Sequence, residues 1–305
     1  MASVQVAARR PGLGLLQAGV SVVALGGIVW WASRQHAPHV PLDARSLSRV
    51  AGALGLYALA TLLRAERWQR ILVRSRVDRG RRESYGLTLV GYMGNNALPA
   101  RAGDLMRVVL LGGPRRTVLG TVVAERLLDV CALAAIFAFV VVDRGLSFGP
   151  LPYVAAAVAA LLLAAIAFVR LAPSSALLLR AREWVRPAAG ASRDLLGLHG
   201  AGLLALSLAL WACEASVYLA VGDAVGVHLG YAGALYVMAL TNLSALIPAA
   251  PGYVGTYDAA VLLALRSLGE PALGYLLALR FVLFVPITVA GFAVFLARYA
   301  RRRAG

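Results

Sequence analysis

Long apolar stretches dominate this chain and alternate with short polar clusters rich in arginine. Six of these stretches approach the length of a helical bilayer crossing, which is roughly 20 residues. They cover residues 13–31, 50–63, 117–142, 151–169, 201–221 and 272–297. The pattern predicts an all-α, polytopic membrane protein with about six full transmembrane helices.

Two further apolar stretches are interrupted by polar residues, glycine and proline. The first covers about residues 85–111 and contains NNALPARAGD, and the second covers about residues 231–268 and contains NLSALIPAAPGYVGTYD. Proline and glycine release backbone groups from the helical ladder, and hydrocarbon cannot satisfy those groups, so each break has to line a polar cavity. We therefore expect two broken or re-entrant helical hairpins in addition to the full crossings.

The distribution of arginine predicts how these segments are oriented in the membrane. Arginines cluster at residues 64–82 and 170–193 and near both ends of the chain. The positive-inside rule places such clusters in the cytoplasm. We interpret residues 64–82 as a basic, amphipathic cytoplasmic segment, and we predict cytoplasmic N- and C-termini in a multi-pass protein of the cell membrane. The first hairpin then has to enter and leave from one face, whereas the second can either re-enter or cross twice.

Composition narrows the class of protein and its partners. Because 60% of the residues are hydrophobic and 14% are charged, we predict one integral membrane domain over residues 1–305. The net charge of +16 falls in clusters that flank apolar stretches, so nucleic acid is not an expected partner. The 2 cysteines and 4 histidines show no metal-ligand spacing, and neither a metal nor another cofactor is expected.

The first break carries charges at membrane depth, where charge usually marks function. N-termini of half-helices bind anions, and Arg101 and Arg107 add positive charge, so a phosphate or carboxylate is the favoured ligand. A competing interpretation is a tight turn at the interface whose arginines reach water. The candidate binding residues of this break are Asn96, Pro99, Arg101, Gly103, Asp104 and Arg107.

Three more charges follow in the next predicted helix, at Glu125, Arg126 and Asp129. Glu125 and Asp129 share one helix face, and Arg126 can pair with Asp129 three residues away. Two interpretations remain open. The charges either form a purely structural ion-pair network, or they also gate a substrate site.

The second break and two isolated charges complete the candidate site. Glu214 lies near the middle of the fifth crossing and Arg280 about one third into the last, and we predict that they pair with each other, since an unpaired charge is costly there. A structural bridge would explain them equally well. The candidates from the second break are Pro251, Gly252, Gly255, Tyr257 and Asp258.

The two breaks resemble each other in sequence and are predicted to enter from opposite sides. Both combine asparagine, leucine and proline with a following glycine and aspartate. Paired interrupted helices of opposite topology indicate an inverted repeat, with the substrate site where the broken helices meet. Chance similarity between apolar sequences is the competing explanation.

At these residues the chain resembles the transmembrane flippase region of lysylphosphatidylglycerol synthases and the related flippase-like membrane proteins. The resemblance covers almost the whole chain and rests on three motifs. They are N-x-L-P-x-R-x-G-D-x-x-R at residues 96–107, E-R-x-x-D at 125–129 and P-G-x-x-G-x-x-D at 251–258. Asp104 and Asp258 stand where many relatives carry Glu, which is a conservative difference.

The resemblance implies an integral domain with re-entrant helices that moves an anionic or modified lipid between leaflets. In the full synthases a separate cytosolic domain charges the lipid. We expect no such domain in this chain, and hence no aminoacyl transfer and no enzyme activity. Membrane lipids are the expected partners, and a homo-oligomer or a separate lipid-modifying enzyme is compatible with the pattern.

We therefore predict a lipid translocator that moves an anionic or phosphate-containing lipid between leaflets. The first alternative is a membrane enzyme or accessory that acts on a lipid-linked phosphate. It lacks support from a nucleophile motif, a metal cluster or a Gly-rich nucleotide loop. The second alternative is a small-solute carrier that uses the same broken helices.

Overall fold

The computed structural model describes residues 43–98, 101–144, 198–245 and 251–303. Within these ranges the chain forms helices and no strand, so the all-α prediction is confirmed. The crossings predicted at residues 13–31 and 151–169 lie outside the described residues. In the described part, three helices are long and apolar enough to cross a membrane. They are α2 (Ala44–Arg74), α8 (Leu198–Val225) and α11 (Leu273–Arg303).

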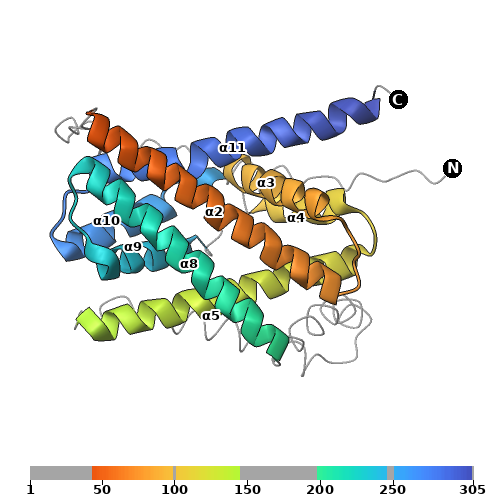
Figure 1. Ribbon diagram of the computed structural model, residues 1–305, viewed down its shortest axis with the longest axis horizontal. Helices are drawn as coiled ribbons and strands as arrows, with labels where there is room; N and C mark the ends of the chain where they lie inside the picture. The colour runs from red at the N-terminus through yellow and green to blue at the C-terminus, as the bar shows by residue number, and fades with distance from the viewer. Residues whose placement is uncertain (1–42, 99–100, 145–197, 246–250, 304–305) are drawn as a thin grey trace, which may run out of the picture.

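Helices α2 and α8 lie side by side and antiparallel (Figure 1). At one end of the pair, the Arg49 side chain donates a hydrogen bond to the backbone carbonyl of Asp223. Towards the other end, Arg67 donates to the Ser207 hydroxyl over 2.8 Å. Helix α2 begins at Asp43, whose carboxylate accepts a hydrogen bond of 2.8 Å from the Ser46 amide and so satisfies one of the free N–H groups of the first turn.

Helix α5 (Arg115–Arg144) is another long helix of the core. Its 30 residues would extend about 45 Å as a helix, enough to span a bilayer. Glu125, Arg126 and Asp129 place three charges in its apolar stretch, so it is not among the three apolar spans. A helix of this kind needs neighbouring helices to cover its charged face. Helices α2 and α4 (Ala102–Leu111) cover this face through ion pairs, and α8 and α9 (Gly230–Ser244) also pack against α5.

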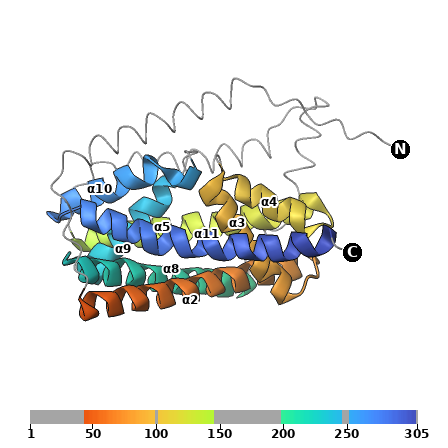
Figure 2. The same ribbon diagram turned by 90° about the horizontal axis from the view of Figure 1, so that it is seen from above.

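The first predicted hairpin is present as α3 (Arg81–Ala97) and α4 (Ala102–Leu111), which pack on each other after a break. Helix α4 has 10 residues, so it rises only about 15 Å and cannot cross a core of about 30 Å. The tight packing depends on glycine, because a Cβ at Gly103 would overlap the Gly91 carbonyl oxygen. Helix α3 also packs on α11 (Figure 2), and the two run antiparallel because Glu83 pairs with Arg298 and Asn96 donates to Thr288.

The second predicted hairpin is present as α9, a short 3-10 turn at Pro251–Tyr253 and α10 (Thr256–Leu268). At 15 and 13 residues, the two helices rise only about 20 Å each. Gly255 caps α10 with φ 93°, a backbone conformation that favours glycine.

One prediction about α2 is wrong. The helix continues without a break to Arg74, and Arg64 and Arg67 are only 3% and 0% exposed. The interpretation of residues 64–82 as a cytoplasmic surface segment therefore fails for its first turn, although Arg70 and Arg74 are exposed. The reason is helical periodicity. Arg64 continues the buried face that carries Tyr57.

Candidate functional site

The two breaks of the chain lie against each other. The Arg101 guanidinium stacks over the Tyr253 ring at 5.5 Å from its centroid. Both residues adopt the left-handed backbone conformation, with φ of 55° and 56°. Residues other than glycine rarely adopt the left-handed backbone conformation. When they do, the strained residue is often part of a functional site. Close to this contact, Gly252 faces the Asn96 carbonyl, and a Cβ on it would lie 3.5 Å from that oxygen.

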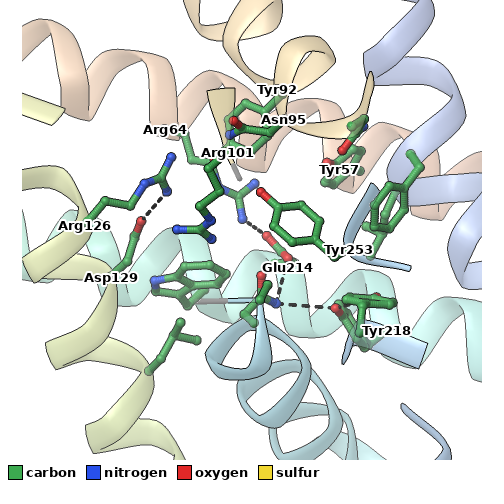
Figure 3. Close-up of a pocket in the computed structure, with 18 residues that line it drawn as sticks. Tyr57, Arg64, Tyr92, Asn95, Arg101, Arg126, Asp129, Glu214, Tyr218 and Tyr253 are labelled. Atoms are coloured by element: carbon green, nitrogen blue, oxygen red, sulfur yellow. Dashed lines mark hydrogen bonds and ion pairs between the residues drawn. The ribbon is translucent and has the colours of Figure 1, made fainter. Parts of the chain in front are cut away.

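A polar cavity of about 80 Å³ opens at this junction (Figure 3). The side chains of Arg64, Arg101 and Arg126 converge on it, together with the carboxylates of Asp129 and Glu214. Aromatic side chains make up much of the remaining wall. They are Tyr57, Tyr92, Trp211, Tyr218, Tyr253, Tyr257 and Phe284.

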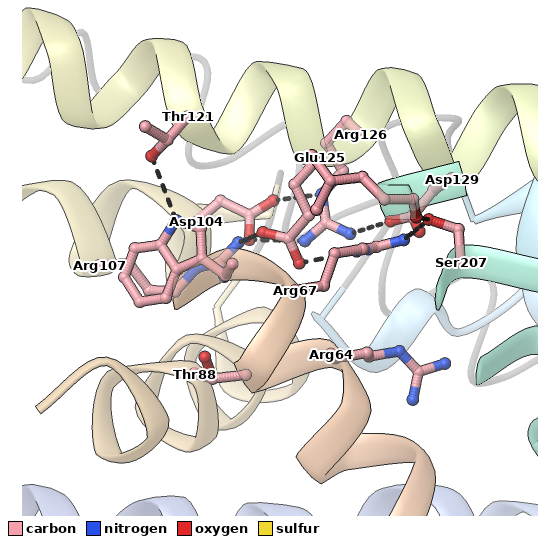
Figure 4. A network of polar contacts seen from close by, with 12 residues as sticks. Arg64, Arg67, Thr88, Asp104, Arg107, Thr121, Glu125, Arg126, Asp129 and Ser207 are labelled. Carbon is pink, nitrogen blue, oxygen red and sulfur yellow. Dashed lines mark hydrogen bonds and ion pairs between the residues drawn. The ribbon is translucent and has the colours of Figure 1, made fainter. Parts of the chain in front are cut away.

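Beside this cavity, six charged side chains form a closed ring in which arginine and carboxylate alternate (Figure 4). Neighbours round the ring approach within 2.7 to 3.6 Å. The ring joins α2, α4 and α5, so it fixes the first hairpin to the core. Its members, in order, are Arg67, Glu125, Arg107, Asp104, Arg126 and Asp129.

Half of the ring is fully buried, whereas Arg126 and Asp104 are 20% and 15% exposed. Arg67 and Glu125 are both 0% exposed, and Arg107 is 1% exposed. The Arg107 guanidinium also stacks over the Trp68 ring at 4.6 Å, and the Trp68 indole donates to Thr121 over 3.1 Å. The predicted pairing of Arg126 with Asp129 is confirmed at 3.1 Å. Because each arginine faces two carboxylates, the six charges compensate one another.

The predicted pairing of Glu214 with Arg280 is wrong. Glu214 forms its ion pair with Arg64 and accepts a hydrogen bond of 3.3 Å from Asn242. Arg280 pairs with Asp258 at 2.5 Å and donates to a backbone carbonyl of the second break. Each charge therefore has another partner than the predicted one, and Arg280 anchors the second break.

One arginine near the two breaks has no carboxylate partner among the described residues. In the described residues, the carboxylates of the ring and of Glu214 and Asp258 number 5 in all, and they pair with 5 arginines. Arg101 is the sixth arginine of this region, and it forms no ion pair with any described carboxylate. Its Nε is buried and has no hydrogen-bond partner there. Among the described residues, the cavity thus holds one positive charge that has no ion-pair partner.

Backbone amides contribute less to this charge than the sequence suggests. At the start of α4, the Asp104 amide donates to the Asn95 side chain over 3.2 Å. At the start of α10, the Gly255 amide donates to the Asp258 carboxylate over 2.9 Å. The expectation that half-helix N-termini stay free for a ligand is therefore wrong for these two groups.

Comparison of the sequence with protein families agrees with this architecture. The family described as the lysylphosphatidylglycerol synthase TM region matches residues 16–291. The chain belongs to this family. The lysylphosphatidylglycerol synthase TM family marks the chain as a membrane protein related to lipid modification or transport, and it confirms the resemblance carried by the three motifs. No curated protein matches the chain, and no solved structure matches it.

In this member of the lysylphosphatidylglycerol synthase TM family, the structure divides the candidate residues into two groups. Those that line the cavity are Asn96, Arg101, Arg126, Asp129, Glu214 and Tyr257. Those that stand outside its lining are Gly103, Asp104, Arg107, Glu125, Pro251, Gly252, Gly255, Asp258 and Arg280. Pro99 lies outside the described residues. Arg107, expected beside Arg101 on the ligand, instead belongs to the ring of ion pairs.

Sequence reasoning missed several residues of the site. Arg64 was assigned to the cytoplasmic cluster, although its spacing of seven from Tyr57 places both on one helix face. Trp211 was not considered, although it stands three residues before Glu214 in the same helix. No sequence signal identifies Tyr253, because its role depends on a left-handed conformation that brings its ring to Arg101.

Proposed function

We propose that the protein moves a phosphate-bearing lipid between the two leaflets of the membrane, with the phosphate held by Arg101. The single observation that supports this is the uncompensated charge. Every described carboxylate at this depth already has an arginine, and Arg101 has none. The phosphodiester of a phospholipid carries one negative charge, which would restore electrical balance.

The guanidinium is well placed for this ligand. It presents N–H donors in a planar fork that matches two phosphate oxygens. Stacking on Tyr253 fixes its plane, and the buried Nε adds a donor that no described residue uses. Burial weakens screening by water, so the attraction for an anion exceeds that of a surface arginine.

The size of the cavity limits what enters it. Its volume of about 80 Å³ is several times the roughly 10–15 Å³ that a cavity needs to hold one water molecule. A phosphate group fits such a space, but a whole phospholipid does not. The acyl chains therefore stay outside the polar cavity while the headgroup passes.

A reconstituted transport assay tests the proposal. Proteoliposomes would carry fluorescent phosphatidylglycerol or, as a neutral lipid, diacylglycerol, and lipid movement would be followed by quenching of the outer leaflet. Since a hydrogen bond to a charged group is worth about 1.5–3 kcal/mol, Arg101→Ala should slow movement of the anionic lipid roughly tenfold or more. Arg101→Lys keeps the charge and should retain part of the rate.

Arg266→Ala is the matched control, because Arg266 is an exposed arginine of α10 away from the cavity. It should leave the rate unchanged. Equal rates for wild type and Arg101→Ala would show that this arginine does not hold the headgroup. Uptake of inorganic phosphate without lipid movement would instead support the small-solute carrier.

A further inference from the structure

A second cavity lies between α2, α3 and α11, and it is almost wholly apolar. Its volume is about 390 Å³. Each of the three helices contributes one stripe of side chains, and the α2 stripe runs from Leu54 to Ala65 at helical spacing. We call this cavity the apolar groove. Besides the α2 stripe, it is lined by Tyr85, Leu89, Pro286, Ile287 and Ala290.

The sequence explains why these helices leave a groove. Ala58, Ala65 and Ala290 have side chains too small to fill the space between the helices. Pro286 interrupts the hydrogen-bond ladder of α11 beside them. The one alcohol in the α2 stripe, Thr61, donates to a backbone carbonyl of its own helix over 2.8 Å, so its polar atom is already satisfied.

The groove and the polar cavity adjoin each other at one residue. Tyr57 lines both spaces and is 8% exposed. The cavity lined by Arg101 and the other charged groups and the groove lined by carbon side chains therefore share this side chain. A molecule with its charged head in the cavity and its apolar tail in the groove would pass alongside Tyr57.

The length of the groove matches one leaflet. From Leu54 to Ala65 the helix rises about 16 Å. Half of the hydrocarbon core is about 15 Å thick. The groove runs from the middle of the apolar part of α2 towards Arg70 and Arg74, which is the cytoplasmic end in the orientation predicted from charge.

We infer that the apolar groove binds one acyl chain of the lipid whose phosphate binds at Arg101, in the cytoplasmic leaflet. The inference rests on the proposed function and adds the path of the tail. An acyl chain suits the groove better than a peptide segment does, because the lining offers almost no partner for the backbone polar groups of a peptide. The tail then stays in an apolar surrounding while the head occupies the polar cavity.

Photocrosslinking tests the groove without requiring transport. The probe is phosphatidylglycerol with a diazirine in one acyl chain, incorporated into proteoliposomes, and the adducts are mapped by mass spectrometry. We expect adducts on Leu54, Leu62 and Ile287. Ala290→Trp fills the groove and should reduce these adducts and the transport rate at least tenfold, while inorganic phosphate still binds within twofold of wild type.

Val289→Trp is the matched control, since Val289 is the neighbouring residue, 63% exposed and outside the groove. It should leave adducts and transport within twofold of wild type. Ala58→Trp fills the groove from α2 and replaces Ala290→Trp if that variant does not fold. Adducts spread evenly over the outer face of α11, or equal effects of the tryptophans at 289 and 290, would overturn the inference.

The same experiment separates this inference from the proposed function. Groove-specific adducts in a protein that moves no lipid would support the groove and refute translocation. Transport that depends on Arg101 but leaves no adducts in the groove would refute the groove and support translocation.

Discussion

Replacing Glu125 by glutamine tests whether the ring of ion pairs is as buried as the structure shows. The substitution keeps the size of the side chain and removes one negative charge. Glu125 is 0% exposed and contacts Arg107 at 3.0 Å and Arg67 at 3.6 Å. Without it, three arginines of the ring share two carboxylates, and one positive charge remains buried without compensation.

The expected cost follows from these contacts. Breaking a buried ion pair by removing one partner costs about 3–5 kcal/mol. The glutamine carbonyl can still accept a hydrogen bond from a guanidinium, which recovers about 1 kcal/mol. We therefore expect Glu125→Gln to lower the free energy of unfolding by about 2–4 kcal/mol.

The assay is reversible unfolding in mixed micelles, followed by circular dichroism during titration with a denaturing detergent. Glu66→Gln is the control, because Glu66 pairs with Arg70 and Arg81, whose side chains are 52% and 72% exposed. Pairs with such exposed arginines contribute about 0–1 kcal/mol, and the glutamine can still accept the hydrogen bond that the Tyr85 hydroxyl donates, so this variant should lose less stability than Glu125→Gln. Adding Arg107→Gln to Glu125→Gln restores the charge balance and should cost less than the sum of the single changes.

Equal stability of Glu125→Gln and Glu66→Gln would refute the reasoning, since it would mean that water reaches the ring. A double variant whose cost equals the sum of the single changes would show that Glu125 and Arg107 do not interact.

Two further predictions concern the backbone. Gly103→Ala should prevent α4 from packing on α3, because the new methyl group would overlap a carbonyl of α3. The control is Gly202→Ala, whose methyl group meets no atom within 4 Å and which should fold normally. Size-exclusion chromatography would show the difference between the two variants. The hydrogen bonds that Asp43 accepts from Ser46 lower the pKa of its carboxyl group, so its cap stabilises α2 at neutral pH and is lost as the pH falls through that lowered pKa. Amide exchange in the first turn of α2 should therefore accelerate at acid pH relative to Asp43→Ser, which keeps a neutral cap; equal behaviour would show that the carboxylate does not cap the helix.

The sequence by itself determined the class of the protein and the two breaks. Hydrophobic length predicts crossings because a helix rises a constant distance per residue and the bilayer core has a nearly constant thickness. Proline and glycine within residues 85–111 and 231–268 predict interruptions because they remove or loosen the helical ladder. The pairing of Arg126 with Asp129 was also predictable, since both lie on one helix, three residues apart.

Only the tertiary structure decided which charges compensate each other across helices. Position in the sequence defines the depth of a charge along its helix, but the rotation of the helix and the identity of its neighbour define the partner. Arg64 thus pairs with Glu214, 150 positions further along the chain, and Arg280 pairs with Asp258. Once these partners are taken, Arg101 remains without a carboxylate in the described residues, and that surplus charge at the meeting of the two breaks is what makes the cavity suited to an anion.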